Sequence, residues 1–389
     1  MAKNEYPATR TCLPSIPCTY PVSFPTPTVP LPRLRKQTKT SSGDREWRIC
    51  HILPLHSRCR VRVGGELTDV FSIQTGLRQG CPLSCMLFNY TLEWVMRSTP
   101  QEPDVIRLNN GTTMDRLAFA DDADLMGETF IGRDHQLANF NSNGKKVGLE
   151  VAESKTKVMK MAREERTEDF IELDEFLLEE VDQFRYLGSI VSWDNDISRE
   201  ISARISAASR ASWGVNDIIK SKIISRRTKL QVYVTTIRPI ATYACETWAL
   251  SKELERRLCV FENGILRRIY GRIRDADTGE WRMRHNRELR EISGLAPITS
   301  FVRAQRLRWA GHVARMPADN PARRALDGVP EGRRPPGRPR MRWVDCVRND
   351  LTILGVDGAD NWRNLAQDRR RWRLLVTAAK GHPGPQLQE

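Results

Sequence analysis

The sequence contains no apolar stretch long enough to cross a bilayer and no N-terminal charged-then-apolar signal pattern. We therefore expect a cytoplasmic or nuclear protein that is neither secreted nor inserted in a membrane. Its nine cysteines include no CxxC pair and their number is odd. That pattern predicts neither a disulfide framework nor a zinc cluster, and it favours a reducing compartment. No internal repeat is present, which argues against a solenoid or propeller.

Basic residues are in clear excess over acidic ones in the sequence. The 389 residues include 62 Lys and Arg against 48 Asp and Glu, a formal net charge of +14. A polyanionic partner fits this excess, because each cation that neutralises a nucleic-acid phosphate releases a condensed counterion. An anionic membrane surface is the competing interpretation of the same charge.

The apolar pattern changes along the chain. Residues 1–45 are Pro-rich and lack a periodic apolar face, so we expect a disordered leader there. Alternation over Arg58–Val63, a Gly64–Gly65 turn and the run Val70–Ile73 predict a hairpin, and Ser84–Arg97 fits a helix.

Short strands are predicted near Val105–Leu108, Leu117–Ala120, Val158–Met161 and Tyr186–Val191, with a helix over Asp134–Lys146. From Ile197 onwards the apolar residues recur at helical spacing. A mixed region followed by helices alone predicts an α+β fold with a small helical bundle after it.

The stretch Leu117–Met126 carries two adjacent acids, Asp121 and Asp122, between apolar flanks. A tight hairpin would lift both carboxylates to the rim of a sheet. Adjacent carboxylates stay ionised together only near cations, and hard divalent ions bound by oxygen meet that need. The alternative is a solvated turn, and Asp124 is better explained as a polar turn residue.

A second motif, Thr75–Ser84, links a strand to a helix. Its residues Gly76 and Gly80 allow close approach of backbone to a ligand, while Arg78 and Gln79 offer donors for a base pair. Taken alone, the segment could be an ordinary strand-to-helix connection.

Together the two motifs resemble the reverse transcriptase of non-LTR retrotransposons (long interspersed elements). The order and spacing of Gly76–Ser84 and Phe119–Asp122 carry the resemblance. Further similar segments are Gly148–Lys157, Phe184–Gly188, Arg306–His312 and Pro336–Pro339. The resemblance covers about residues 46–378. It implies a partial polymerase palm over 46–192, an antiparallel sheet with packed helices. A helical thumb-like region over 193–275 and a basic, mostly helical C-terminal region over 276–389 follow.

The resemblance also implies roles for single residues. Asp121 and Asp122 would hold the catalytic Mg²⁺ ions, and Phe119 would lie near the incoming nucleotide or primer end. Arg78, Gln79 and Gly80 would face the template and the nascent base pair, and Lys155 would face the leaving pyrophosphate. A primer grip would consist of Phe184, Tyr186, Leu187 and Gly188. Lys155 could equally be part of a solvated face, and Phe184 could be plain core.

Members of that family bind the metals with one further Asp on an earlier strand. Before Gly76 this chain has only Asp44 and Asp69 as aspartates, and neither lies in an apolar run at a suitable distance. Loss of a metal ligand commonly removes most of the rate. We therefore expect an incomplete two-metal site and read the chain as a truncated or rearranged element.

The C-terminal region alternates Trp and Arg. A Pro/Gly-rich loop contributes Arg333, Arg334, Arg338 and Arg340, which are the predicted nucleic-acid contacts. Tryptophans such as Trp362 and Trp372 are instead expected in a core. Three functions stay open: a polymerase that extends a DNA primer on an RNA template with dNTPs, a non-catalytic RNA- or DNA-binding remnant, and a translated relic without function. The oligomeric state does not follow from the sequence.

Overall fold

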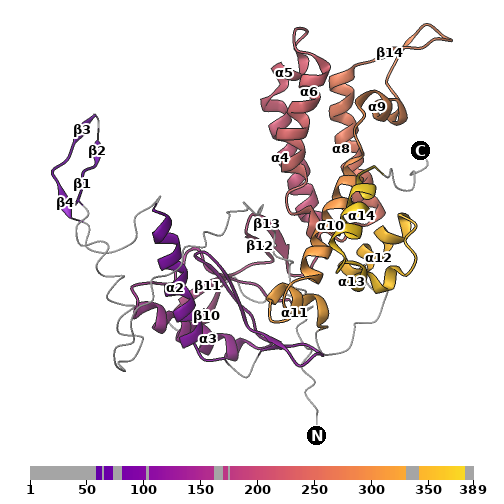
Figure 1. The fold of residues 1–389 in the computed structure, drawn as a ribbon. Helices are drawn as coiled ribbons and strands as arrows, with labels where there is room; N and C mark the ends of the chain where they lie inside the picture. Colours follow the sequence, from indigo (N-terminus) through magenta and orange to yellow (C-terminus); the bar gives the residue numbers. More distant parts are fainter. Residues whose placement is uncertain are drawn as a thin grey trace, which may run out of the picture.

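A computed structural model describes residues 58–63, 65–72, 81–101, 105–161, 170–173, 176–329 and 341–381. The predicted leader and the two Arg-containing loops at 73–80 and 330–340 lie outside these ranges. Strands gather in the first half of the described chain and helices dominate the second (Figure 1). The predicted α+β class is confirmed.

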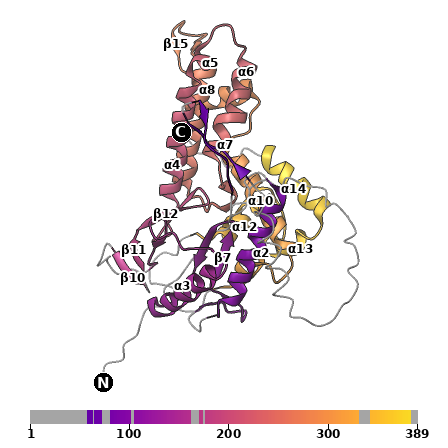
Figure 2. The same ribbon diagram turned by 90° about the vertical axis from the view of Figure 1, so that its left-hand side faces the viewer.

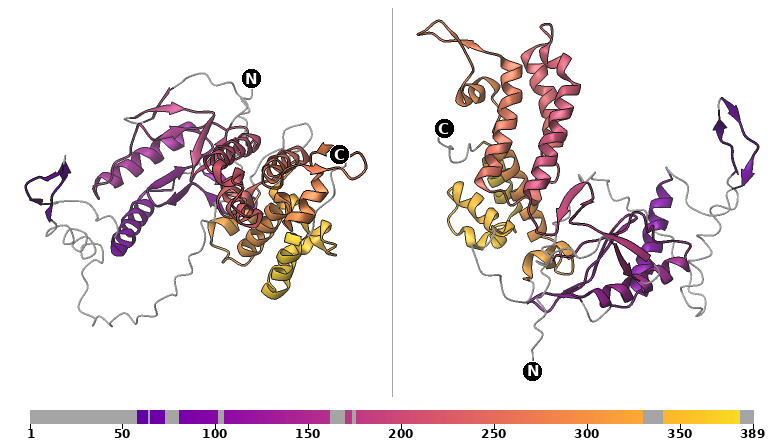
Figure 3. Two further views of the ribbon diagram at one scale, coloured as in Figure 1. Left: turned by 90° about the horizontal axis from the view of Figure 1, so that it is seen from above. Right: turned by 180° about the vertical axis from the view of Figure 1, so that it is seen from behind.

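The first element is a separate hairpin. Strand β1 (Arg58–Cys59) pairs with β4 (Phe71–Ser72), and β2 (Arg62–Val63) pairs with β3 (Glu66–Leu67). Both ladders are antiparallel, which confirms the hairpin predicted from the alternation and the glycine turn. The hairpin stands apart from the other elements in Figures 1 and 3.

Two helices lie beside the short strands that follow. They are α2 (Pro82–Ser98), which begins at a proline, and α3 (Phe130–Lys145), which is capped by the Thr129 hydroxyl. The antiparallel pairs beside them are β5 (Ile106–Arg107) with β6 (Thr113–Met114), and β7 (Arg116–Phe119) with β8 (Asp122–Leu125).

A second group of strands packs on α3. Strand β11 (Phe176–Glu180) lies between β10 (Phe170–Leu173) and the parallel β9 (Lys157–Val158). Leu137 of α3 joins Val158, Phe176 and Leu178 in a small core. The hairpin β12 (Gln183–Tyr186) and β13 (Ser189–Ser192) then leads into the helices.

The helical part begins with a group of helices that surround one core. Its elements are α4 (Ser198–Gly214), α5 (Asn216–Lys220), α6 (Arg226–Val232), the π-helical turn η1 (Tyr233–Ile237), α7 (Arg238–Ala241), η2 (Cys245–Thr247) and α8 (Lys252–Tyr270). The predicted bundle is confirmed here. The expectation of helices alone is wrong, because β14 (Ile273–Arg274) and β15 (Trp281–Arg282) form a further hairpin.

The C-terminal elements build a second helical core. They are α9 (Asn286–Ser293), α10 (Ile298–Ala314), α11 (Pro321–Asp327), α12 (Trp343–Ile353), η3 (Ala359–Asn361), α13 (Trp362–Leu365) and α14 (Arg369–Gly381). Trp362 and Trp372 are buried in this core, as expected, and their ring centroids lie 6.1 Å apart. Ile298 at the start of α10 belongs to the first helical core and Leu307 to the second, so α10 joins the two.

The chain then returns to the strands. The backbone N–H of Asn109 donates to the Val329 carbonyl at 2.9 Å, and the Val329 N–H donates to the Asn109 side chain at 2.9 Å. Ala325 of α11 packs on the small core of Ile106 and Leu108. The C-terminal region therefore contacts the strand-containing part, which lies below α10 and α12 in Figure 2. In the described part of the chain no helix is long and apolar enough to span a bilayer.

Candidate functional site

The two adjacent acids lie at the tip of the hairpin β7–β8. The register pairs Phe119 with Asp122, which leaves Ala120 and Asp121 as a two-residue turn. Ala120 has φ 53°, a left-handed conformation that costs a residue with a Cβ about 1–2 kcal/mol. Asp121 and Asp122 are both exposed, so the predicted hairpin with acids at its rim is confirmed.

Asp124 is not the polar turn residue that the sequence suggested. It lies within β8 opposite Leu117, two residues from Asp122, and strand alternation puts both acids on one face. Its half-buried carboxylate accepts a hydrogen bond from the Tyr186 hydroxyl. The pKa of Asp124 is raised to about 6, chiefly by burial; the hydrogen bond from Tyr186 opposes this rise and the nearby charge of Asp122 adds to it.

Tyr186 joins the acid-bearing hairpin to the next one. It is buried on β12, and burial together with the charges of Asp124 and Asp122 raises the pKa of its hydroxyl. The hydroxyl is therefore a stable donor to Asp124. Two segments about sixty residues apart in sequence thus meet at one face, which the sequence alone did not reveal.

The hairpin β12–β13 turns through Leu187 and Gly188. Both have positive φ, 45° and 84°, as a two-residue turn that matches strand twist requires. Phe184 is half-buried and packs edge-to-face on Tyr186, with ring centroids 6.3 Å apart. Of the predicted grip residues, only Gly188 is exposed, while Phe184 and Leu187 are partly accessible.

Contacts from the helical part hold this turn. The Tyr243 hydroxyl donates to the Leu187 carbonyl at 2.7 Å, and the Ile190 N–H donates to the Glu200 carboxylate at 2.7 Å. The guanidinium of Arg204 contacts the Gly188 carbonyl and lies 4.4 Å from the Tyr243 ring centroid. The turn therefore has a fixed position relative to α4.

We expect Tyr243→Phe to reduce the free energy of unfolding by about 1 kcal/mol, the usual net value of one hydrogen bond. The ring stays, so the contact with Arg204 is kept and only the bond to Leu187 is lost. Urea unfolding followed by tryptophan fluorescence measures the change. Tyr90→Phe, at an exposed hydroxyl on α2, is the matched control and should leave the midpoint in place. Equal midpoints for both variants would show that the Tyr243 bond contributes nothing.

The acids fit part of a metal site. Asp121 and Asp122 supply carboxylate oxygens, which Mg²⁺ prefers. Among the residues with described positions, no three His, Cys, Asp or Glu side chains are grouped to hold a metal ion. The neighbouring Asp124 is already engaged with Tyr186. The described chain therefore provides two exposed acids at this tip, with the half-buried Asp124 on the same face and hydrogen-bonded to Tyr186.

The remaining predicted site residues are less closely tied to the acids. Phe119 is 44% exposed next to the turn, so its ring is available to a ligand. Lys155 is exposed in a turn whose backbone N–H donates to Ala152, and within the described residues no ion pair links it to Asp121 or Asp122. The predicted contacts Arg78, Gln79, Gly80, Arg333, Arg334, Arg338 and Arg340 lie outside the described residues.

Comparisons with known proteins agree with the geometry. Residues 28–191 match the family model of reverse transcriptase, the RNA-dependent DNA polymerase. This match begins before residue 46, where we expect the palm to start, so the domain limits stay a prediction. A transposon-derived protein of Caenorhabditis elegans is 28% identical over 276 residues, which are 69% of this chain and 96% of the relative.

Proposed function

We propose that this chain carries a reverse transcriptase segment of a non-LTR retrotransposon and binds a primer–template without completing the catalytic metal site. The family implies an RNA template, a DNA primer and dNTPs as partners. The finer assignment to non-LTR elements rests on the loop and hairpin motifs quoted above.

The observation that carries the proposal is the meeting of two hairpins. One presents Asp121 and Asp122 at an exposed turn, and the other contacts its face through Tyr186. A primer end held by the second hairpin would lie beside the acids of the first. The helices from α4 onwards would serve as a thumb, because Tyr243 and Arg204 fix the second turn to them.

Chemistry at such a site needs charge compensation at phosphate oxygens. When bound, Mg²⁺ would supply it, held by Asp121 and Asp122. Phe119 would contact the nucleotide or primer end, and Lys155 would face the leaving pyrophosphate. Tyr186 would orient Asp124, and the described residues bring no third acid together with Asp121 and Asp122 to complete the metal site. We therefore expect this chain to bind a primer–template but not to extend the primer.

A primer-extension assay on poly(rA)/oligo(dT) with Mg²⁺ tests the catalytic part. We expect the chain and its Asp121→Ala variant to give the same background incorporation. Asp277→Ala, an exposed acid in the distant turn between β14 and β15, is the control for nonspecific charge change. Incorporation that falls at least tenfold in Asp121→Ala and persists in Asp277→Ala would establish a working active site and overturn the proposed defect.

The salt dependence of primer–template binding tests the other part. Each phosphate contact contributes about 0.7–0.9 to the slope of log K against log salt. A holding surface of several contacts therefore predicts a clearly negative slope. A slope near zero would instead favour the second candidate, a translated relic without a nucleic-acid role.

A further inference from the structure

A basic cavity lies between two C-terminal helices, away from the acid-bearing hairpin. It has a volume of about 750 Å³ and opens between the second half of α10 and the helix α14. These two helices run close together in Figure 1. Trp372 and Val376 form its apolar floor, and the Trp372 indole is fixed by donating to the Leu307 carbonyl at 2.8 Å.

The walls of the cavity carry one sign of charge. Arg308 and His312 lie at helical spacing on α10 and Arg315 caps its C-terminal end, while Arg369, Arg373 and Lys380 lie at helical spacing on α14. Among the residues with described positions, no acidic side chain lines the cavity. Two basic rows therefore face the same space.

In the described part of the chain, three of these cations lack the carboxylate partners that other arginines of α10 have. One turn earlier, Arg303 and Arg306 are buried against Asp350 at 3.3 and 2.9 Å. Within the described chain no carboxylate pairs with Arg308, Arg369 or Arg373. Unpaired cations held close together repel one another, so an anion placed among them would be stabilised.

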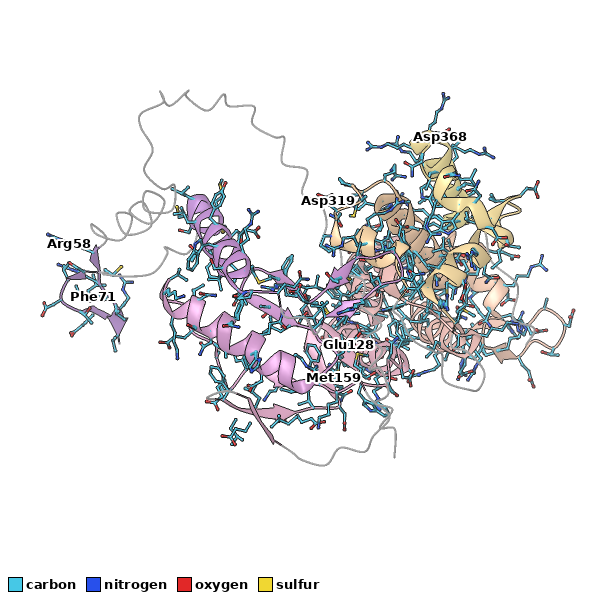
Figure 4. All side chains as sticks on the ribbon, turned by 90° about the horizontal axis from the view of Figure 1, so that it is seen from below. Arg58, Phe71, Glu128, Met159, Asp319 and Asp368 are labelled. Atoms are coloured by element: carbon cyan, nitrogen blue, oxygen red, sulfur yellow. The ribbon has the colours of Figure 1, made fainter. Side chains whose placement is uncertain are left out.

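Lowered pKa values of two groups in the cavity wall are consistent with this crowding of positive charge. Burial lowers the pKa of His312, and the charges of Arg315 and Arg369 lower it further. The pKa of Arg315 is lowered by burial and by Arg369 in the same way. Asp368 does not line the cavity, and its carboxylate accepts the backbone N–H groups of Arg370 and Arg371. Figure 4 shows Asp368 at the start of α14, with long nitrogen-tipped side chains spreading outward around it.

We propose that this cavity binds consecutive phosphates of a single nucleic-acid strand. Guanidinium groups bind phosphate in a bidentate fashion. The row from Arg369 to Lys380 extends about 16 Å at the helical rise, which suits several phosphates better than one free anion. The inference rests on the proposed nucleic-acid function but concerns a separate surface from the two hairpins.

Two double variants of the full chain test the site. Arg369→Gln/Arg373→Gln removes two charges from the cavity, and Arg370→Gln/Arg371→Gln removes two from exposed positions of the same helix that do not line it. Fluorescence anisotropy with a 20-nucleotide single-stranded RNA, and with DNA of the same sequence, measures affinity at several salt concentrations. Circular dichroism checks that both variants fold.

The cavity variant should lose about tenfold or more in affinity, and its salt slope should fall by about 1.5 because two phosphate contacts are removed. The control should stay within about twofold of the unaltered chain. A difference between the affinities for RNA and for DNA would show which kind of strand the cavity prefers. Equal losses in the two variants would overturn the proposal, because net charge alone would then explain binding. Binding of phosphatidylserine vesicles that depends on Arg369 and Arg373, without strand binding, would overturn it as well.

The two proposals fail in different ways. If the unaltered chain binds single strands but not a primer–template duplex, the proposed function fails and the cavity stands. If it binds the duplex and the cavity variant binds single strands as well as the control does, the cavity fails and the proposed function stands.

Discussion

Replacing Glu262 by alanine should lower the free energy of unfolding by about 3–5 kcal/mol, the range for breaking a buried charge pair. Glu262 is fully buried on α8. It accepts the Tyr233 hydroxyl at 2.7 Å and the Ile298 N–H at 2.8 Å, and it pairs with Arg290 at 2.7 Å. One carboxylate thus joins η1, α9 and the start of α10.

The large effect follows from what is left behind. The buried guanidinium of Arg238 lies 3.9 Å from Glu262 and would have no nearby carboxylate among the described residues in the variant. The Tyr233 hydroxyl and the Ile298 N–H would also lose their acceptor. Unsatisfied buried groups cost more than the bond itself contributes. Burial raises the pKa of Tyr233, and the charge of Glu262 raises it as well, so this hydroxyl stays a donor.

Urea unfolding followed by circular dichroism measures the change. The control is Glu253→Ala on the same helix, where the acid is exposed and pairs with Arg256 at 2.9 Å. Surface pairs of this kind are worth about 0–1 kcal/mol. If Glu262→Ala shifts the midpoint no more than Glu253→Ala does, the buried network is not what holds α8 and α10 together.

Several elements could be predicted from the sequence because their signals are local. Alternation and Gly64–Gly65 predicted the first hairpin, and the apolar flanks of Asp121–Asp122 predicted the second. The helical period from Ile197 predicted α4, α6 and α8. In each case the residues that determine the element are close together in the sequence, so their spacing alone indicates a helix or a hairpin.

The missed features depend on contacts between distant segments. Asp124 was read as a turn residue because its pairing with Leu117 and its bond to Tyr186 are invisible in the linear sequence. The bond from Tyr243 to the Leu187 carbonyl spans 56 residues. A buried acceptor of this kind has no periodic signature, so only the fold reveals it.

For the same reason the sequence predicts nucleic-acid contacts in the loop Arg333–Arg340 and not in the basic cavity. Arg333–Arg340 is conspicuous as a run, whereas the arginines of the cavity are spread over α10 and α14 among ordinary helical residues. Helical spacing gathers each set on one face, and the packing of the two helices joins the sets. Gly311, in the last turn of α10, leaves the space that the Trp372 indole occupies and so makes that packing possible.

Gly311→Ala should destabilise the C-terminal region by about 3 kcal/mol. A Cβ at this position would lie 2.1 Å from Nε1 of Trp372 and 2.8 Å from another ring atom, so the indole would have to move. Overpacking of a core typically costs about 1–3 kcal/mol. Displacing the indole also breaks its bond to Leu307 and its packing on Trp362.

Thermal unfolding measures this effect, and Gly264→Ala on α8 is the matched control. No atom lies within 4 Å of a Cβ at Gly264, so that variant should gain about 0.5–1 kcal/mol from the better helix former. Because Trp372 is also the floor of the cavity, Gly311→Ala should weaken strand binding together with stability. A displaced indole should disturb a binding site that is built on it. If Gly311→Ala loses stability but keeps its affinity for single strands, Trp372 is therefore not part of the strand-binding site.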